Sequence, residues 1–123
     1  MKNTLFRFKQ FQIDQSKSAM KIGTDGVLLG AWTSVSSKPK TILDIGSGTG
    51  LIALMLAQRT DGSRIKAIEI DAAAAAEAAK NFKNSPWFDR LELLHTDLLN
   101  YTQKSSETFD LIVSNPPFFT VSL

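Results

Sequence analysis

The chain has 123 residues, of which 43% are hydrophobic, a size and composition typical of one globular domain. It contains no cysteine, which excludes disulfides and thiolate metal sites. The sequence has no run of about 18 apolar residues and no apolar leader, so it predicts neither a transmembrane helix nor a secretory signal and favours the cytoplasm.

The net charge of +2 is distributed unevenly along the chain. Residues 1–40 carry seven Lys or Arg and two Asp, a net charge of +5, so residues 41–123 carry −3. A basic segment beside a mildly acidic body is consistent with a polyanionic partner such as RNA. On charge alone, solvated surface charge is the commoner explanation.

Residues 1–40 are expected to form an N-terminal extension. Within it, residues 5–13 alternate apolar and polar side chains, as a half-buried strand does. Thr24 or Asp25 suits the cap of a helix over residues 24–34. The apolar face of that helix would consist of Val27, Leu28, Ala31 and Trp32.

From residue 41 onward, short apolar runs alternate with helix-forming segments. Strands are expected over residues 41–46, 64–70, 90–98 and 108–115. Helices are expected over residues 51–60 and over the alanine-rich residues 71–85, which Pro86 ends. Residues 99–107 are expected to be a short, poorly helical crossover. This alternation predicts a parallel α/β sheet covered on both faces.

A glycine-rich turn joins the first of these strands to the first helix. In the sequence DIGSGTG, Gly46, Gly48 and Gly50 permit a sharp turn and a close approach of backbone to ligand. Glu69 lies 19 residues after Gly50, at the end of the next strand, where a carboxylate can accept both hydroxyls of a ribose. These residues predict a site for an adenosine-containing cofactor. If the glycines served only to make a tight turn, Glu69 would be unexplained.

The residue before the turn distinguishes between cofactors. The glycine spacing differs from the G-x-G-x-x-G of dinucleotide sites, and Asp44 would repel a pyrophosphate. The same carboxylate would attract a cationic amine such as that of S-adenosylmethionine. We therefore expect S-adenosylmethionine, and a nicotinamide oxidoreductase is disfavoured.

Asp97 ends the third expected strand, on the same sheet edge as Asp44 and Glu69. It could accept a bond from an adenine amino group, and a helix or turn cap fits the local sequence about as well. The single histidine, His95, is expected to have a structural or rim role. The sequence shows neither metal-ligand spacing nor a Ser-His-Asp arrangement.

The fourth expected strand leads into the sequence Asn115, Pro116, Pro117 and Phe118. The Asn115 amide oxygen and the Pro116 carbonyl, held rigid by Pro117, provide two adjacent acceptors for the N–H groups of one planar amine. Phe118 offers a face for stacking a flat group. The motif predicts an amine clamp, and the alternative is a proline-stiffened turn with a core phenylalanine.

Together these motifs resemble the class I S-adenosylmethionine-dependent methyltransferases. DIGSGTG resembles their cofactor loop, and NPPF resembles the catalytic tetrapeptide of the amino-group branch, which adenine N6-, guanine N2- and glutamine N5-methyltransferases share. The segment MKIGTDGVLLGAW, residues 20–32, is similar to the segment before the cofactor loop in the tRNA(Val) adenine-37 N6-methyltransferases. The resemblance covers residues 6–119.

This resemblance implies a Rossmann-like open parallel sheet with strand order 3-2-1-4. Residues 1–40 would close over the cofactor, residues 41–123 would bind it, and the reaction would be methyl transfer to N6 of a tRNA adenine, with no metal and no membrane partner. It assigns cofactor binding to Lys21, Thr24, Asp25, Asp44, Gly46, Ser47, Gly48, Gly50, Glu69, Ile70, Asp97, Leu98 and Asn115. It assigns catalysis to Asn115, Pro116, Pro117 and Phe118.

Two alternatives to this function stay open. A protein glutamine amide is another planar amino group that fits the same clamp, and the chain could bind cofactor without catalysing transfer. Members of the family continue through three more strands. We therefore expect either that this chain is an N-terminal portion, or that a second copy covers the exposed fourth strand and forms a homo-oligomer.

Overall fold

The computed structural model describes residues 5–7, 12–14 and 30–114. No helix among these residues has the length and apolar character needed to cross a membrane. The elements in chain order are β1 (Leu5–Arg7), β2 (Gln12–Asp14), β3 (Thr41–Ile45), α2 (Leu51–Arg59), β4 (Arg64–Glu69), α3 (Ala72–Lys83), the 3-10 turn η1 (Phe88–Arg90), β5 (Leu91–His95), α4 (Leu98–Lys104) and β6 (Leu111–Ser114).

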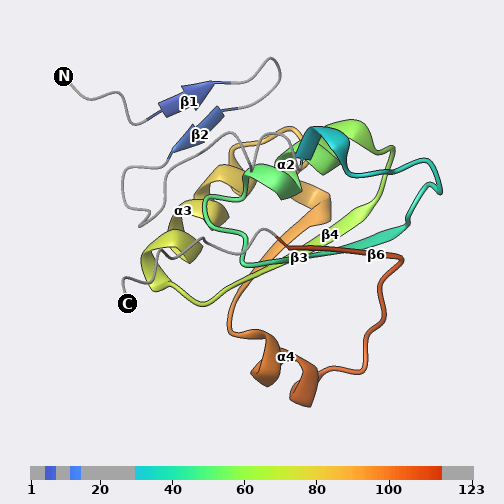
Figure 1. Cartoon of the computed structure of the whole chain (residues 1–123). Helices are drawn as coiled ribbons and strands as arrows, with labels where there is room; N and C mark the ends of the chain where they lie inside the picture. The colour runs from blue at the N-terminus through green and yellow to red at the C-terminus, as the bar shows by residue number, and fades with distance from the viewer. Residues whose placement is uncertain (1–4, 8–11, 15–29, 115–123) are drawn as a thin grey trace, which may run out of the picture.

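Four parallel strands form the main sheet in the order β5-β4-β3-β6, which confirms the predicted order 3-2-1-4 counted from residue 41. Ile42 of β3 lies opposite Ile65 of β4 on one side and Leu111 of β6 on the other. The crossovers from β3 to β4 and from β4 to β5 proceed in the same direction. Right-handed crossovers then place α2 and α3 on the same face, as Figure 1 shows.

The main core lies between this face and the two helices. Ile42, Ile65 and Val113 from three strands pack there with Phe82 of α3. Six of the nine residues of α2 are buried, which explains why its sequence is apolar almost all round. This side of the sheet is therefore covered as predicted.

The opposite face is only partly covered by described residues. Tyr101 of α4 packs against Leu43 and Ile68, and its hydroxyl donates to Glu107 at 3.1 Å. Ile112, on the edge strand β6, remains 56% exposed. The expectation of cover on both faces is thus confirmed for one face and met in part for the other, and pairing of two copies through β6 stays a prediction.

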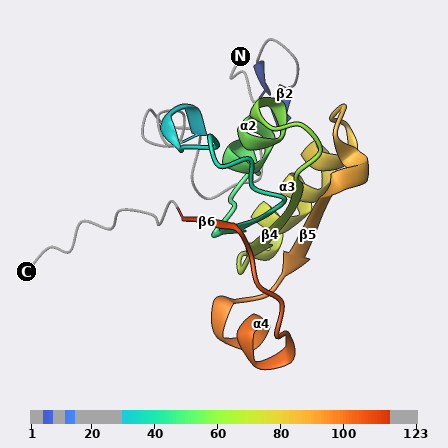
Figure 2. The same ribbon diagram turned by 90° about the vertical axis from the view of Figure 1, so that its right-hand side faces the viewer.

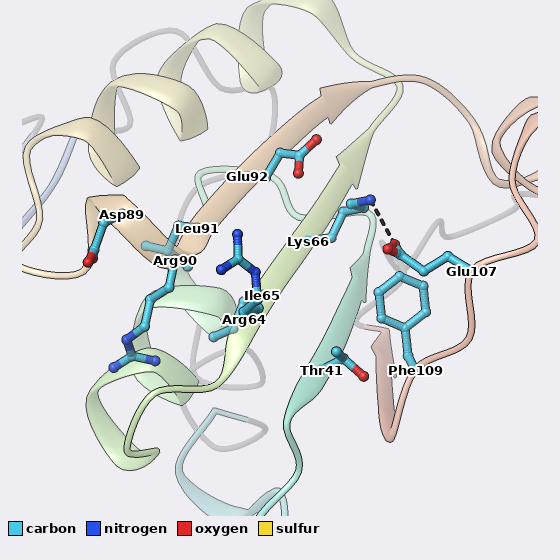
Figure 3. Close-up of a pocket in the computed structure, with 10 residues that line it drawn as sticks. All are labelled: Thr41, Arg64, Ile65, Lys66, Asp89, Arg90, Leu91, Glu92, Glu107 and Phe109. Carbon is cyan, nitrogen blue, oxygen red and sulfur yellow. Dashed lines mark hydrogen bonds and ion pairs between the residues drawn. The ribbon is translucent and has the colours of Figure 1, made fainter.

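An open hollow of about 450 Å³ lies toward the amino-terminal ends of the strands (Figure 3). Its lining mixes charges of both signs, and the Lys66 ammonium forms an ion pair of 2.7 Å with Glu107 across it. Among the described residues, none of those predicted to bind the cofactor lines this hollow. The candidate site is therefore defined by chemistry at the opposite edge of the sheet.

The N-terminal extension differs from its prediction in two respects. The single strand expected over residues 5–13 is instead two three-residue strands, β1 and β2, whose antiparallel pairing satisfies backbone groups of both. Residues 30–32 are helical within the predicted helix, yet Ala31 and Trp32 are exposed, the latter by 75%. Gly30 is the packed residue instead: a Cβ there would collide with Met55, and its carbonyl accepts from Arg59 at 2.8 Å.

The segment after the third main-sheet strand also differs from its prediction. The strand expected to reach residue 98 ends at His95, and α4 occupies much of the crossover over residues 99–107, which was expected to be poorly helical. Asp97 caps this helix by accepting from the Asn100 backbone N–H at 2.7 Å. Local capping and the burial of Tyr101 stabilise a helix that composition alone does not indicate.

Arg90 connects η1 to the end of α2, and its removal should destabilise the fold. Its half-buried guanidinium donates to the carbonyls of Ala57, Thr60 and Ser63 at 2.6, 3.1 and 2.9 Å. We expect Arg90→Ala to lower the free energy of unfolding by about 2–3 kcal/mol, because those acceptors lose a charged donor. Arg90→Lys should recover only part of this, since an ammonium lacks the planar fork. Urea denaturation measures both.

The exposed Arg64 provides the control for this measurement. Arg64→Ala should change the unfolding free energy by less than about 0.5 kcal/mol. An equally small effect of Arg90→Ala would contradict the structural role assigned to Arg90.

Candidate functional site

The candidate site lies at the carboxyl edge of the main sheet. The glycine loop, residues 46–50, follows β3, Glu69 ends β4 and Asp97 follows β5. The chain order reverses between β3 and β6, and ligands of open α/β sheets bind at such a switch point. The β6 strand ends at Ser114, directly before the predicted clamp in sequence.

The three glycines of the loop all adopt left-handed backbone conformations. Their φ angles are 71° at Gly46, 55° at Gly48 and 89° at Gly50. A Cβ at either of the first two would meet no described residue within 4 Å, so in the described part of the chain these positions face open space. A Cβ at Gly50 would collide with the Phe82 ring. The first two glycines thus leave room for a ligand, and the third permits close packing against α3.

Backbone and carboxylate acceptors of β4 hold this loop in place. The N–H groups of Gly46 and Ser47 donate to the Ile68 carbonyl at 2.9 and 3.1 Å. The Gly48 N–H donates to Glu69 Oε1 at 2.7 Å, and the Asp71 N–H donates to Oε2 at 2.8 Å. Because a carboxylate has about four lone-pair positions, Glu69 can hold the loop and still accept ribose hydroxyls.

Asp44 lies behind this loop as a buried carboxylate with no hydrogen-bond partner in the described part of the chain. Its complete burial and, to a lesser extent, the negative charge of Glu69 raise its pKa to about 7, against the lowering effect of the nearby Ala53 N–H. The Ser47 hydroxyl is likewise buried, and no described residue forms a hydrogen bond with it. A buried, unpaired carboxylate is costly, and a cationic ligand would offset that cost.

Exposed apolar side chains follow the acidic residues at this edge. Ile70, directly after Glu69, is 68% exposed, and Leu98 follows Asp97 and is also exposed. The His95 ring nitrogen Nε2 shares a hydrogen bond with the Ile70 carbonyl at 3.0 Å, which agrees with a structural role at the rim. Such apolar surfaces suit the flat faces of an adenine.

For Asp97, the structure favours one of the two roles left open by the sequence. Its carboxylate accepts from the Asn100 backbone at 2.7 Å and from the Asn100 side chain at 2.9 Å. The capping role is therefore confirmed, while a contact with adenine stays a prediction.

Several predicted site residues lie outside the described residues, and their assignments stay predictions: Lys21, Thr24, Asp25, Asn115, Pro116, Pro117 and Phe118. Within the described ranges, no group of three or more His, Cys, Asp or Glu is arranged to hold a metal ion.

Sequence reasoning missed two residues that contact the loop from the side of α3. Asn81 donates from Nδ2 to the Thr49 carbonyl at 2.9 Å, and Phe82 packs against Gly50. The available signal was an amide side chain among the alanines of this helix, at a position that its apolar pattern would bury.

A parallel sheet with a glycine loop after one strand and an acidic residue ending the next defines a Rossmann-like nucleotide-binding fold. The family model for the methyltransferase small domain matches residues 16–122. The chain belongs to this methyltransferase family.

Individual proteins agree with this assignment. The chain is 57% identical over 115 residues to the tRNA1(Val) (adenine(37)-N6)-methyltransferase of Flavobacterium psychrophilum, which covers 94% of this chain and 49% of that protein. The solved Bacillus cereus O-methyltransferase in complex with SAH superposes with a TM-score of 0.65 and 25% identity, over 80% of this chain and 47% of that one.

A more distant structure shows the fold alone. The S-adenosylmethionine-dependent methyltransferase from Agrobacterium tumefaciens superposes with a TM-score of 0.74 at 15% identity, over 95% of this chain and 41% of that one. The chain spans about half the length of the curated relatives it matches.

The raised pKa of Asp44 should make the ligand-free chain less stable as the pH rises. Because the folded-state pKa of about 7 exceeds the ordinary 3.8, the folded chain binds the proton more tightly than the unfolded chain. Stability should therefore fall between about pH 4 and pH 7 and level off above, by at most about 4 kcal/mol. Asp44→Asn removes this titration and should be the more stable form at pH 7.5.

Urea denaturation of both proteins between pH 4 and pH 7.5 tests this. The measured quantity is the difference in unfolding free energy between variant and wild type, which cancels the titration of groups that both proteins share. A difference that stays constant across the range would contradict an elevated pKa at Asp44.

Proposed function

We propose that this chain binds S-adenosylmethionine and serves methyl transfer to the exocyclic N6 of an adenine in tRNA. The observation that carries the proposal is the buried Asp44 carboxylate behind the glycine loop. Among the described residues, this carboxylate has no hydrogen-bond partner and nothing fills the space over Gly46 and Gly48. This arrangement suits a cofactor with positively charged groups and disfavours a pyrophosphate. Membership of the methyltransferase family supports the reaction, and the Flavobacterium relative supports the tRNA substrate.

The residues present fit this cofactor group by group. The spaces over Gly46 and Gly48 can receive its methionine part. In the proposal, Lys21, Thr24 and Asp25 also bind this part of the cofactor. Glu69 retains lone pairs for the ribose hydroxyls, and the exposed Ile70 and Leu98 provide apolar surfaces for the adenine, beside Asp97. When bound, S-adenosylmethionine supplies an electrophilic methyl group.

The motif after β6 supplies the other half of the proposed chemistry. The Asn115 amide oxygen and the Pro116 carbonyl accept the two hydrogens of the target amine, with Pro117 stiffening the backbone between strand and aromatic residue. Phe118 stacks the base, which has to leave its own stack to reach an enzyme site. Orientation of the amine provides most of the rate, so a strong general base is unnecessary.

The cofactor assignment is tested by calorimetric titration with S-adenosylmethionine, with NAD as control. We expect binding of the first alone. Affinity should rise between pH 6 and pH 8, because a cationic ligand favours the ionised form of Asp44, whose pKa is about 7. Asp44→Asn should weaken binding at pH 8 by about tenfold or more and remove most of the pH dependence. Binding of NAD and not S-adenosylmethionine would overturn the proposal.

The substrate assignment is tested by transfer of a labelled methyl group to tRNA that lacks the modification, with a release factor as the alternative acceptor. Asn115→Ala should reduce transfer to tRNA at least about a hundredfold and change the affinity for S-adenosylmethionine less than about threefold, because Asn115 is proposed to hold the amine. Transfer to the release factor alone would support the glutamine alternative. If the chain binds S-adenosylmethionine but transfers a methyl group to neither acceptor, the result would support the alternative that it binds the cofactor without catalysing transfer.

A further inference from the structure

Asn81 is a buried polar residue that the proposed chemistry does not use. It lies on α3, is only 4% exposed and contacts the glycine loop. Its Nδ2 donates to the Thr49 carbonyl at 2.9 Å. Thr49 stands between Gly48 and Gly50 and is itself buried, so its carbonyl has little access to water.

The residue next to Asn81 makes a second contact with the same loop. Phe82 is buried in the main core, and its ring lies so close to Gly50 that a Cβ there would collide with it. Two consecutive residues of α3 therefore contact two consecutive residues of the loop. The loop leads into α2, and α2 and α3 lie on the same face of the sheet, as Figures 1 and 2 show. The contact between α3 and the loop therefore joins neighbouring elements.

The loop needs such support because its sequence is intrinsically flexible. Gly46, Gly48 and Gly50 lose more conformational entropy on ordering than other residues would. From β4, the Ile68 carbonyl and the Glu69 carboxylate hold the N–H groups of its first half. On the α3 side, Asn81 holds the Thr49 carbonyl in its second half. A loop fixed from both sides needs little further ordering when a ligand binds.

We propose that Asn81 is a positioning residue for the cofactor, holding the glycine loop through Thr49 in the conformation that receives S-adenosylmethionine. This inference rests on the proposed cofactor. Asn81 acts on affinity by ordering the loop beforehand, while Gly46, Gly48 and Glu69 face the ligand.

Asn81→Ala and Asn81→Asp test this role, with Ala79→Gly as control. Ala79 is on the exposed side of α3, so Ala79→Gly weakens the helix without touching the loop. Calorimetry gives the dissociation constant for S-adenosylmethionine. Amide hydrogen exchange of Gly46, Ser47 and Gly48, relative to the β3 strand, gives the order of the loop.

We expect Asn81→Ala to raise the dissociation constant by about tenfold and to speed exchange of the loop amides, since the buried Thr49 carbonyl loses its donor. Ala79→Gly should leave both quantities unchanged. Asn81→Asp should behave like Asn81→Ala at pH 8. Its defect relative to wild type should shrink toward pH 6, because a buried carboxyl group gains a proton in this range and can then donate to the carbonyl.

Two results would overturn the proposal. One is wild-type affinity and wild-type loop exchange in Asn81→Ala. The other is an equal loss of affinity in Ala79→Gly, which would reduce the effect to helix stability. If the wild-type chain does not bind S-adenosylmethionine, the cofactor assignment fails and this inference with it. That result is distinct from a loss confined to the Asn81 variants.

Discussion

The site depends on one carboxylate that connects three segments of the chain. Glu69 ends β4, accepts from Gly48 in the loop after β3 and accepts from Asp71 at the start of α3. The parallel register makes this possible, because it brings the ends of β3 and β4 to the same level. Farther along α3, Asn81 also holds the loop, through the Thr49 carbonyl. The loop, the β4 strand and the α3 helix are therefore all connected to one another by hydrogen bonds.

Asp44 shows that this fold tolerates a residue that lowers its stability. A buried carboxylate with no partner among the described residues opposes folding at neutral pH. Residues that lower stability in the absence of a ligand are common where a ligand later compensates them. The neighbouring core, which includes Ile42 and the six buried residues of α2, offsets this cost by apolar burial. Asp44 thus opposes folding of the ligand-free chain, and it is the group that we propose attracts a cationic cofactor.

Sequence patterns predicted those parts of the fold where local and tertiary preferences agree. The strands from residue 41 onward and the helices α2 and α3 follow from apolar periodicity and alanine content, whereas the strand order was implied by the family resemblance. The α4 helix was missed because a side-chain cap and one buried tyrosine decide it. Asp44 and Glu69 were identified by spacing, whereas Asn81 meets Thr49 only once the chain is folded, 32 residues apart in sequence.

The strand order also has a consequence for how the chain folds. The β3-α2-β4-α3-β5 segment pairs each strand with the next along the chain, so its contacts close short loops. The β6 strand instead pairs with β3, and directly before it the Asp110 N–H donates to the Thr41 carbonyl at 3.0 Å, across a sequence separation of 69 residues. Contacts of such long sequence separation slow folding and tend to form after local ones. The strand that leads to the Asn-Pro-Pro-Phe sequence is therefore the one expected to join the sheet last, at the edge of β3 that the other three strands leave free.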